Sequence, residues 1–600
     1  MDRKAWIAII LSVIGLGTWQ WFYVKNYSLT PEQKAAAAEA AQAESATVAA
    51  ASPQAPPTAT SPETTASASG TATTTPTRSE IPVMTARRES LSNQNAEYVF
   101  SNDLGGIEQA TLLLHFGEHK NAVFINDSSA LPIGAIGEKP ESPWGGFTMV
   151  ADAGKGEVVF SRTDEDGLET IKRFYISSGD DKADLYRLRL ELAFRNTGRG
   201  QVSRQGYFVS TGGAAPIHPK DLPMYTKFDW MHGDGDFEKI DVNWFNASSV
   251  PLLGIPIREA RALYDEQKPD VAWAGVASQY FCTIVTTERT KGRSTWASRF
   301  DASRADGAKV QGIQGGLGMP EFTLAPGEEL KESFLIYIGP KELQRLEKLG
   351  AGQDEVMSFG MFGIVSKFLL WAMNRLQGVL HSYALAIIVL TLLIKSALWP
   401  IQNKATNQMR KMSLLSPKMT EVREKYKDDP QKMNTKMMEL YKDYGVNPLS
   451  GCLPMLIQIP IFFGFYTMLG SAIELRNSHF LWITDLSQPD TIWHIPGINF
   501  PVNLLPILMA GTMIWQMAIS PKSGDAMQQR LFYFMPVIFL VFCYNYASGL
   551  ALYWTTQNIF SIVQLYLTRN KPLPTLEKKA TPAVKKGAPP AKKKKKRPGQ

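Results

Sequence analysis

Long runs of apolar residues divide this chain and restrict what it can fold into. The first run, Ala5 to Val24, contains no charged residue. About 20 apolar residues in a helix cross the ~30 Å hydrocarbon core of a bilayer. Further candidate spans follow Gly339: Ser382 to Trp399, Leu453 to Ile473, Leu504 to Ile519, Phe532 to Tyr546 and Leu550 to Leu567. We therefore expect a membrane protein with six spans, several of them near the lower limit of length.

The first run is interpreted as an uncleaved anchor, with a cleaved signal peptide as the alternative. It ends in Trp21 and Tyr23, aromatic residues typical of a membrane interface, and no small-residue cleavage site lies nearby. Residues 1–30 are thus predicted to form an N-terminal membrane anchor. The basic Arg3 and Lys4 place the N-terminus in the cytoplasm.

Two segments of contrasting composition follow the anchor. Residues 31–80 are rich in Ala, Pro, Ser and Thr, which predicts a disordered tether. Residues 81–345 contain short runs of alternating apolar and polar residues, such as Asp184 to Phe194 and Glu332 to Gly339, separated by turn residues. This pattern predicts an antiparallel β-sandwich, and its position after the first span places it in the periplasm. The glycines from Gly312 to Gly318 are interpreted as a flexible loop.

The rest of the chain is predicted to be helical. Residues 346–378 are apolar but interrupted by charges, which favours an amphipathic helix lying in the membrane interface. Residues 379–568 are predicted to form a five-span core, in which segment 401–450 is rich in Lys and Arg. The tail, residues 569–600, contains the basic block Lys592 to Arg597. By the positive-inside rule, the basic segment and both termini are cytoplasmic.

The basic segment 401–450 has the pattern of a helical hairpin. Apolar residues recur at three- and four-residue steps on both sides of a turn at Asp428 to Pro430. The methionines among them are Met409, Met412, Met419, Met433 and Met437. They form either the core of the hairpin itself or a pliable apolar surface that contacts hydrophobic clients or the ribosome. The expected fold is a multi-domain membrane protein, with a periplasmic antiparallel β-sandwich, an α-helical polytopic membrane core and a cytoplasmic helical hairpin.

One basic residue, Lys395, falls inside a predicted span. A lysine there is costly unless its side chain snorkels to the headgroups or faces water. The first interpretation is snorkelling to the cytoplasmic headgroups, and the second is a positive charge in a water-filled groove open to the cytoplasm and the lipid. The number of polar residues in the spans favours the groove over simple helix packing. They are Thr391, Gln458, Gln516, Thr555, Thr556, Gln557 and Asn558.

Several motifs resemble the YidC family of insertases. The stretch NPLSGCLPMLIQIPIFFGFYTML, Asn447 to Leu469, is similar to the family's third-span signature. FYFMPVIF at Phe532 to Phe539 and SGLALYWTTQN at Ser548 to Asn558 resemble its last two spans. VAWAGVASQYF at Val271 to Phe281 resembles its periplasmic domain. The order of the parts fits this family along nearly the whole chain.

The resemblance implies a membrane protein insertase and folding chaperone. Such a protein moves hydrophobic segments of its clients from the cytoplasm into the inner membrane through a hydrophilic, lipid-open groove. The family's groove cation corresponds to Lys395, with Gln516 and Trp554 on the same wall. The family usually has arginine at this position, and lysine keeps the charge but lacks the planar fork for bidentate contacts. Ala547 is a second departure, because proline commonly precedes Ser548 in the family.

No catalytic residue, metal site or cofactor is predicted. His115 to His119 matches the H-x-x-E-H zinc-peptidase pattern, but it follows a strand-like run and contains Gly117, which favours a hairpin turn. The three cysteines lie far apart and match no metal spacing. Because no phosphate-binding loop is found, the expected insertase does not hydrolyse ATP itself.

The expected partners follow from the resemblance and the charge distribution. They are nascent membrane proteins, the Sec translocon (SecYEG and SecDF), the ribosome and anionic lipids, but not DNA. The basic tail suits both the ribosome and anionic lipids. The chain is expected to act alone or with the Sec translocon. The alternatives to an insertase are a membrane-anchored periplasmic scaffold or binding protein, and a transporter.

Overall fold

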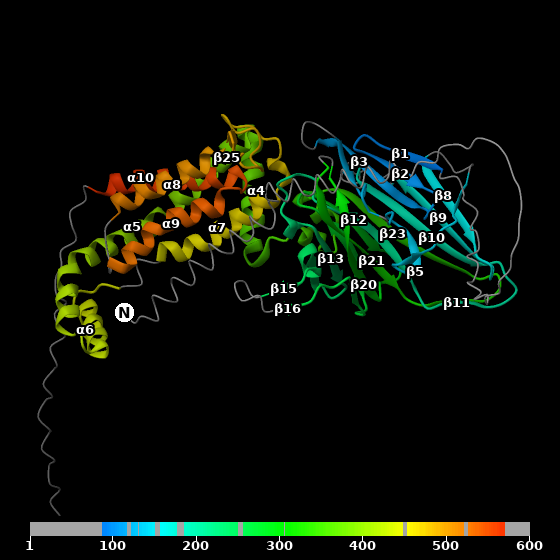
Figure 1. Cartoon of the computed structure of the whole chain (residues 1–600), viewed down its shortest axis with the longest axis horizontal. Coiled ribbons are helices and arrows are strands. Elements are labelled where there is room, and N and C mark those ends of the chain that lie inside the picture. The colour runs from blue at the N-terminus through cyan, green and yellow to red at the C-terminus, as the bar shows by residue number, and fades with distance from the viewer. Residues whose placement is uncertain are drawn as a thin grey trace, which may run out of the picture. The chain divides into compact units, whose positions relative to one another are not determined.

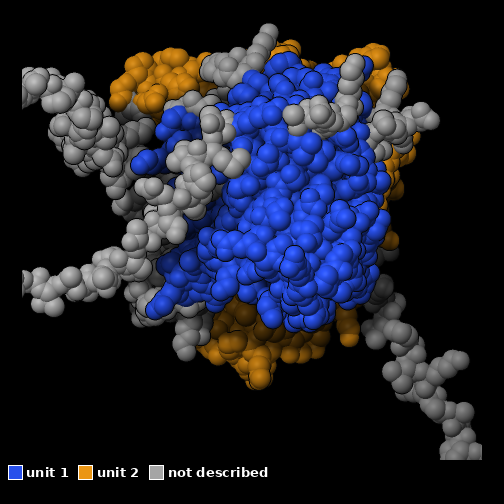
Figure 2. Space-filling view, turned by 90° about the vertical axis from the view of Figure 1, so that its right-hand side faces the viewer, with its two compact units in different colours: residues 1–278, 282–339 blue, residues 279–281, 340–600 orange. Residues whose placement is uncertain are grey.

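A computed structural model describes residues 87–569, apart from 117–121, 130, 151–155, 177–184, 250–255, 305–306, 448–452, 498 and 521–525. The predicted anchor and tether, and the basic tail beyond Arg569, lie outside the described residues. The described chain forms two compact units (Figure 1, Figure 2). Unit 1 extends to Gly339 without Gln279–Phe281, and unit 2 contains those three residues and the chain from Pro340 onwards.

Unit 1 is built on β-sheets, of which the largest has nine strands in the order β14-β13-β18-β19-β23-β10-β9-β8-β7. Strand β10 (Arg187–Asn196) pairs antiparallel with both β9 and β23. Its alternating sequence buries Leu188, Leu190 and Phe194 on one face, as the pattern predicts. The other strands of this sheet are β7 (Thr148–Met149), β8 (Glu157–Thr163), β9 (Leu168–Ile176), β13 (Lys227–His232), β14 (Phe237–Asp241), β18 (Val271–Ala277), β19 (Phe281–Thr287) and β23 (Glu329–Pro340).

A second sheet, of six strands, packs on the first. Its order is β17-β20-β21-β12-β5-β6, and its strands β12 and β21 contact β18 of the nine-stranded sheet. The strands are β5 (Ile136–Lys139), β6 (Ser142–Pro143), β12 (Tyr207–Ala214), β17 (Leu263–Glu266), β20 (Ser294–Ser303) and β21 (Lys309–Met319). The prediction of an antiparallel β domain, with two sheets enclosing a core, is therefore confirmed for unit 1.

Smaller elements complete unit 1. A four-stranded sheet contains β1 (Arg88–Ser92), β2 (Ala96–Ser101), β3 (Gly106–Phe116) and β4 (Ala122–Ile125). There are two strand pairs, β11 (Val202–Arg204) with β22 (Phe322–Leu324) and β15 (Ser248–Ser249) with β16 (Pro256–Arg258). The short 3-10 helices are η3 (Pro223–Tyr225) and η4 (Val242–Phe245). The zinc-peptidase-like sequence joins β3 to β4, which pair antiparallel. The predicted hairpin thus has its two strands, while its tip, residues 117–121, lies outside the described residues.

The glycine-rich stretch lies in strand β21, so the predicted flexible loop is wrong. A Cβ atom added at Gly315 would lie 2.6 Å from Cδ2 of Phe228 in the facing sheet. One added at Gly316 would lie 2.8 Å from Nε1 of Trp296 on the neighbouring strand. Aromatic rings fill the space beside this strand, and only glycine lets the two sheets approach so closely.

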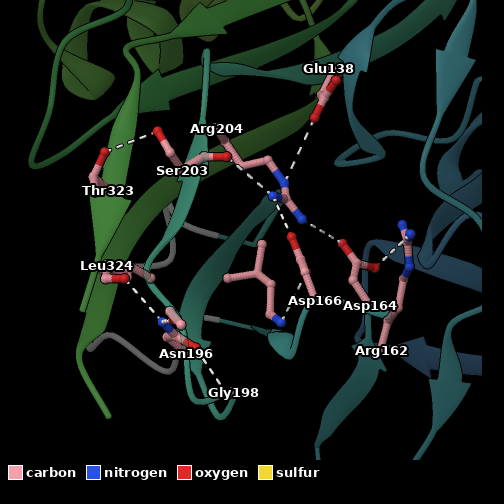
Figure 3. A network of polar contacts seen from close by, with 12 residues as sticks. Glu138, Arg162, Asp164, Asp166, Asn196, Gly198, Ser203, Arg204, Thr323 and Leu324 are labelled. Atoms are coloured by element: carbon pink, nitrogen blue, oxygen red, sulfur yellow. Dashed lines mark hydrogen bonds and ion pairs between the residues drawn. The ribbon is translucent and has the colours of Figure 1, made fainter. Parts of the chain in front are cut away.

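An ion cluster joins three sheets of unit 1 (Figure 3). Arg204 on β11 pairs with Asp166 at 2.7 Å, with Asp164 at 3.1 Å and with Glu138 at 3.7 Å. The two aspartates lie in the turn between β8 and β9, and Glu138 lies on β5. Hydrogen bonding to Arg204 lowers the pKa of Asp166 below its ordinary value. We call these four residues the arginine clamp.

Unit 2 is mostly helical. Helix α10 contacts α5, α7 and α8, and α4 contacts α5 and α7. The helices are α3 (Leu343–Leu349), α4 (Gly363–Leu380), α5 (Tyr383–Lys425), α6 (Pro430–Asp443), α7 (Leu453–Ser471), α8 (Leu504–Ile519), α9 (Ala526–Cys543) and α10 (Ser548–Arg569). Short 3-10 helices η5 (Gln353–Met357), η6 (Gly360–Phe362) and η8 (Ile473–Leu475), and a strand pair, β24 (Thr491–Ile495) with β25 (Phe500–Asn503), connect them.

Helix α5 is continuous where the sequence suggested a span followed by a separate hairpin helix. It runs for 43 residues through Pro400 and Pro417. Among the described residues it is the one helix that is long and apolar enough to cross a membrane. Three helices carry shorter apolar segments, Leu456–Ser471, Leu504–Ile519 and Tyr533–Cys543. The number of spans and their orientation therefore stay predictions.

Helix α4 covers the later part of the predicted interfacial segment. It buries Leu369, Leu370 and Met373 on one side. On its other side Ile364 is 88% exposed and Trp371 50% exposed, which is an apolar outer surface. Such a surface fits a lipid environment better than water.

Candidate functional site: a polar seam between three helices

Lys395 lies in the apolar half of α5 and is half-buried. Its Nζ is 3.5 Å from Oε1 of Gln458 on α7, a long hydrogen bond. No described carboxylate lies within ion-pair distance of this ammonium group. A cation held by an amide alone in apolar surroundings retains much of its desolvation cost, because an amide dipole offsets only part of a full charge.

The Gln458 amide is the centre of the site. Its Nε2 donates to the Tyr553 hydroxyl at 2.6 Å and to Oε1 of Gln557 at 2.9 Å. An amide side chain has one carbonyl oxygen and two N–H groups, and here the oxygen and the nitrogen both have partners. Gln458 therefore connects Lys395 on α5 to Tyr553 and Gln557 on α10. We call these four residues the polar seam.

Further polar pairs continue along the contact of α5 with α10. Nε2 of Gln564 donates to Oδ1 of Asn403 at 3.2 Å, and Nη2 of Arg410 donates to the Thr568 carbonyl at 2.7 Å. From Lys395 to Arg410 the seam and these pairs cover about 22 Å of helix. The contact between the two helices is thus polar along much of its length.

The other predicted groove residues lie elsewhere. Thr391 is buried and donates to the Ile387 carbonyl of its own helix. Nδ2 of Asn558 donates to the Thr512 hydroxyl at 3.0 Å, which ties α10 to α8. Trp554 packs between Phe462 and Phe539, with ring centroids 4.8 and 4.5 Å apart, and Gln516 is half-exposed on α8. The structure thus joins Lys395, Gln458 and Gln557 by contacts and gives Asn558 the packing role considered for polar residues in spans.

Sequence reasoning missed Tyr553, Asn403 and Gln564. A signal for Gln564 was present, because Gln557, Ser561, Gln564 and Thr568 recur at three- and four-residue steps on one face of α10, and all four are buried. Tyr553 begins the same stripe, four residues before Gln557.

The end of α5 and α6 pack together through the predicted methionine stripes. Leu415, Met419, Tyr441 and Val446 are buried, with Met412, Met437, Leu440 and Tyr444 packed against them. Asp429 caps the start of α6 by accepting from the Lys432 backbone N–H at 3.0 Å. Met412, Met419 and Met437 therefore serve the hairpin's own core. Met409 and Met433 are half-buried, and Met438, which was not among the predicted residues, is 55% exposed.

The fold and the polar seam define a class of protein in which a β domain precedes an apolar helical bundle with a basic side chain, Lys395, among its helices. Residues 100–372 match the YidC periplasmic domain family, and residues 375–574 match the family described as 60Kd inner membrane protein. The chain is 30% identical over 487 residues to a membrane protein insertase YidC of Citrifermentans bemidjiense, covering 78% of this chain and 83% of that one.

A relative of the same description from Geobacter metallireducens is 30% identical over 602 residues and covers 96% of this chain and 100% of its own length. A crystal structure of an active YidC insertase with its first transmembrane domain resolved covers 82% of this chain and 94% of that one, at 17% identity and a TM-score of 0.33. The chain belongs to the YidC family of inner-membrane insertases. The match to the family's periplasmic domain covers unit 1 from residue 100 and continues into the start of unit 2.

Proposed function

We propose that this chain inserts and folds nascent membrane proteins in the inner membrane, with the polar seam as its working site. The observation that supports this function is the Lys395 ammonium held by Gln458 among apolar helices, with no described carboxylate beside it. A proton or ion pathway would pair such a cation with an acidic group. A cation kept without one retains its attraction for polar and acidic parts of a passing client.

The mechanism is thermodynamic assistance rather than bond chemistry. A client loop that enters bare hydrocarbon leaves backbone N–H and C=O groups unsatisfied, at several kcal/mol each. Hydrogen-bonding groups along α5, α7 and α10, in a groove open to the cytoplasm and the lipid, lower this barrier. The client's apolar helix then moves into lipid and gains about 25 cal/mol per Å² of apolar area removed from water. Neither step requires ATP.

The proposed topology places both termini, the end of α5, and α6 in the cytoplasm. The charge distribution supports this orientation, because segment 401–450 is basic whereas residues 477–503 contain no Lys or Arg. The exposed Met438 and the half-buried Met409 and Met433 then face arriving clients or the ribosome. The basic tail binds both the ribosome and anionic lipids. The Sec translocon delivers some of the clients.

The test is insertion of a short single-span protein into proteoliposomes that carry only this chain, without nucleotide. We expect Lys395→Glu to lower insertion about tenfold, equivalent to about 1.4 kcal/mol of barrier. Lys404→Glu is the matched control, because Lys404 is exposed on the same helix. Lys395→Arg should retain activity because it keeps the charge.

Each outcome distinguishes the proposed function from its alternatives. Insertion that is indifferent to Lys395→Glu would remove the polar seam from the mechanism. No insertion by the folded native chain would favour a periplasmic scaffold. Solute uptake without insertion would favour a transporter.

A further inference from the structure

The strand pair β24–β25 carries an apolar face directly before α8. Trp493 lies opposite Val502, and Ile495 opposite Phe500, while His494 pairs with Pro501. Residues directly opposite each other in an antiparallel pair share one face of the sheet. Trp493, Ile495, Phe500 and Val502 therefore gather on one face, which we call the apolar hairpin face. His494 lies on the opposite face.

The two aromatic residues of this face are exposed, and Ile495 and Val502 are half-buried. Trp493 is 56% exposed and Phe500 47% exposed. Leu481 and Trp482, in the loop before the strands, are 77% and 41% exposed. Trp482 donates from Nε1 to Asp490 at 3.0 Å, which places it at the base of the hairpin. Exposed apolar groups gathered on one short segment mark an interaction surface.

The hairpin is held rigidly, so it cannot fold its apolar side chains inward. Nδ2 of Asn503 donates to the Tyr544 carbonyl at 2.6 Å, and the Tyr544 hydroxyl donates to the Pro501 carbonyl at 2.6 Å. Asp490 accepts from the Leu505 backbone N–H at 2.7 Å. These bonds fix the hairpin to the start of α8 and the end of α9.

The charge around this face suits a neutral partner. Residues 477–503 contain no Lys or Arg and two carboxylates, those of Asp485 and Asp490. Both are used inside the fold, since Asp485 accepts from the Ser487 backbone N–H at 2.8 Å and Asp490 binds the start of α8. Neither an acidic nor a basic protein surface finds a complementary charge here. Tryptophan and other aromatic residues beside neutral polar groups are typical of the membrane interface.

The length of α8 points the same way. Its 16 residues give about 24 Å of helix, whereas the hydrocarbon core of a bilayer is ~30 Å thick. The outward side chains of α8, among them Ile514 and Trp515, are apolar. An apolar hairpin at the outer end of α8 adds apolar surface where the helix is too short. Mismatch of this kind is otherwise relieved by thinning the bilayer.

We infer that the apolar hairpin face inserts among phospholipids at the headgroup–acyl boundary of the periplasmic leaflet, and that it fixes the depth of α8. This inference rests on the topology of the proposed function. It assigns lipid, rather than a protein, as the partner of this surface.

The experiment measures spin-label accessibility in liposomes of phosphatidylcholine that contain only this chain, with its native cysteines replaced. Labels at Trp493→Cys and Phe500→Cys should collide with oxygen in the lipid and be shielded from a water-soluble nickel chelate. At these two positions the ratio of oxygen accessibility to nickel-chelate accessibility should be about threefold higher than for a label at His494→Cys, as for groups buried ~5–10 Å into the interface. Replacing part of the lipid with phosphatidylglycerol should leave the ratio unchanged, because the face is neutral.

A second measurement avoids the labels and the loss of cysteines. The difference in fluorescence between the native chain and Trp493→Phe isolates Trp493, and brominated phosphatidylcholine should quench this difference signal. Equal water access at positions 493 and 494, together with an unquenched Trp493, would overturn the inference. So would shielding that appears only on adding a partner protein, or spin–spin broadening between two copies of the chain.

The insertion assay in the same liposomes keeps this inference separate from the proposed function. Loss of insertion with a lipid-buried Trp493 would count against the function alone. Insertion that continues with a water-exposed Trp493 would count against the hairpin alone.

Discussion

Two basic side chains, Arg204 in unit 1 and Lys395 in unit 2, have opposite surroundings. In unit 1, Arg204 is surrounded by three carboxylates, and its side chain is 13% exposed. In unit 2, Lys395 has the Gln458 amide beside it and no described carboxylate at ion-pair distance. A satisfied cluster stabilises the fold that contains it, whereas an under-satisfied cation keeps its capacity to bind something else.

This difference fits the separate roles of the arginine clamp and the polar seam. The sheets of unit 1 must hold a fixed shape, and the arginine clamp pairs its charges across three of them. The helices of unit 2 are proposed to receive chains of many sequences. A site for varied clients needs polar groups that the protein itself has not fully used. We therefore expect that removing the Arg204 charge destabilises unit 1, whereas removing the Lys395 charge does not destabilise unit 2.

The largest expected effect is in unit 1. Arg204→Met leaves Asp166 and Glu138 without their cation and Asp164 with Arg162 alone, and it should lower the free energy of unfolding of unit 1 by about 3 kcal/mol. Thermal unfolding of the full chain in detergent measures this loss. Arg173→Met is the control, since the Arg173 side chain is 49% exposed and its ion pairs are weak, at 3.6 and 3.9 Å. A loss no larger than that of the control would show that the arginine clamp does not stabilise unit 1.

The next effect concerns how closely the sheets of unit 1 pack. Gly315→Ala forces a Cβ atom against the Phe228 ring and should cost about 2 kcal/mol of unfolding free energy. Gly200→Ala, where a Cβ atom meets nothing within 4 Å, should be close to neutral. Denaturant unfolding of both variants is the measurement. An equal change in unfolding free energy in the two variants would show that the two sheets can move apart without cost, unlike a close-packed core.

In unit 2 we expect stability and function to change in opposite directions. Lys395→Met keeps the length of the side chain and removes an under-satisfied charge, so unfolding free energy should stay level or rise by about 1 kcal/mol. Insertion should nevertheless fall several-fold. Gln458→Leu should instead lower stability, because it leaves the Lys395 ammonium, the Tyr553 hydroxyl and Gln557 without their partner. Asn558→Leu is the contrasting variant, because it breaks a contact with α8 and should lower stability. A marked loss of stability in Lys395→Met would give the seam the same structural role as the arginine clamp.

The smallest expected effect is a pH dependence in unit 1. Asp166 has a pKa below its ordinary value because Arg204 hydrogen-bonds its charged form. Its contribution is therefore present at neutral pH and is lost as the pH falls below about 4 and through the lowered pKa. The melting temperature of the native chain should drop more steeply there than that of Asp166→Asn. Parallel pH curves would show that the clamp does not depend on this carboxylate.

Several features of the fold followed from local pattern. The alternation around Leu188 and Leu190 predicted a strand with one buried face, because side chains of a strand alternate between its two faces. The apolar runs predicted the helices of unit 2, and the steps between Met412, Met419 and Met437 predicted a helical pair. Lys395 stood out because a charge in an apolar run is costly wherever the helix lies. Each of these inferences needs only residues within a few turns of one another.

What the sequence determined by itself was the kind of each element and the position of the unusual charge. The tertiary structure alone decided that the glycines near Gly315 form a strand, because the Phe228 ring that requires them comes from a distant segment. It also decided that α5 continues through Pro400, and that Gln458 and Tyr553 meet Lys395 from two other helices. Contacts between distant segments depend on how whole elements pack, and periodicity within one element carries no information about its neighbour. For that reason the sequence identified the cation, and the fold identified its partners.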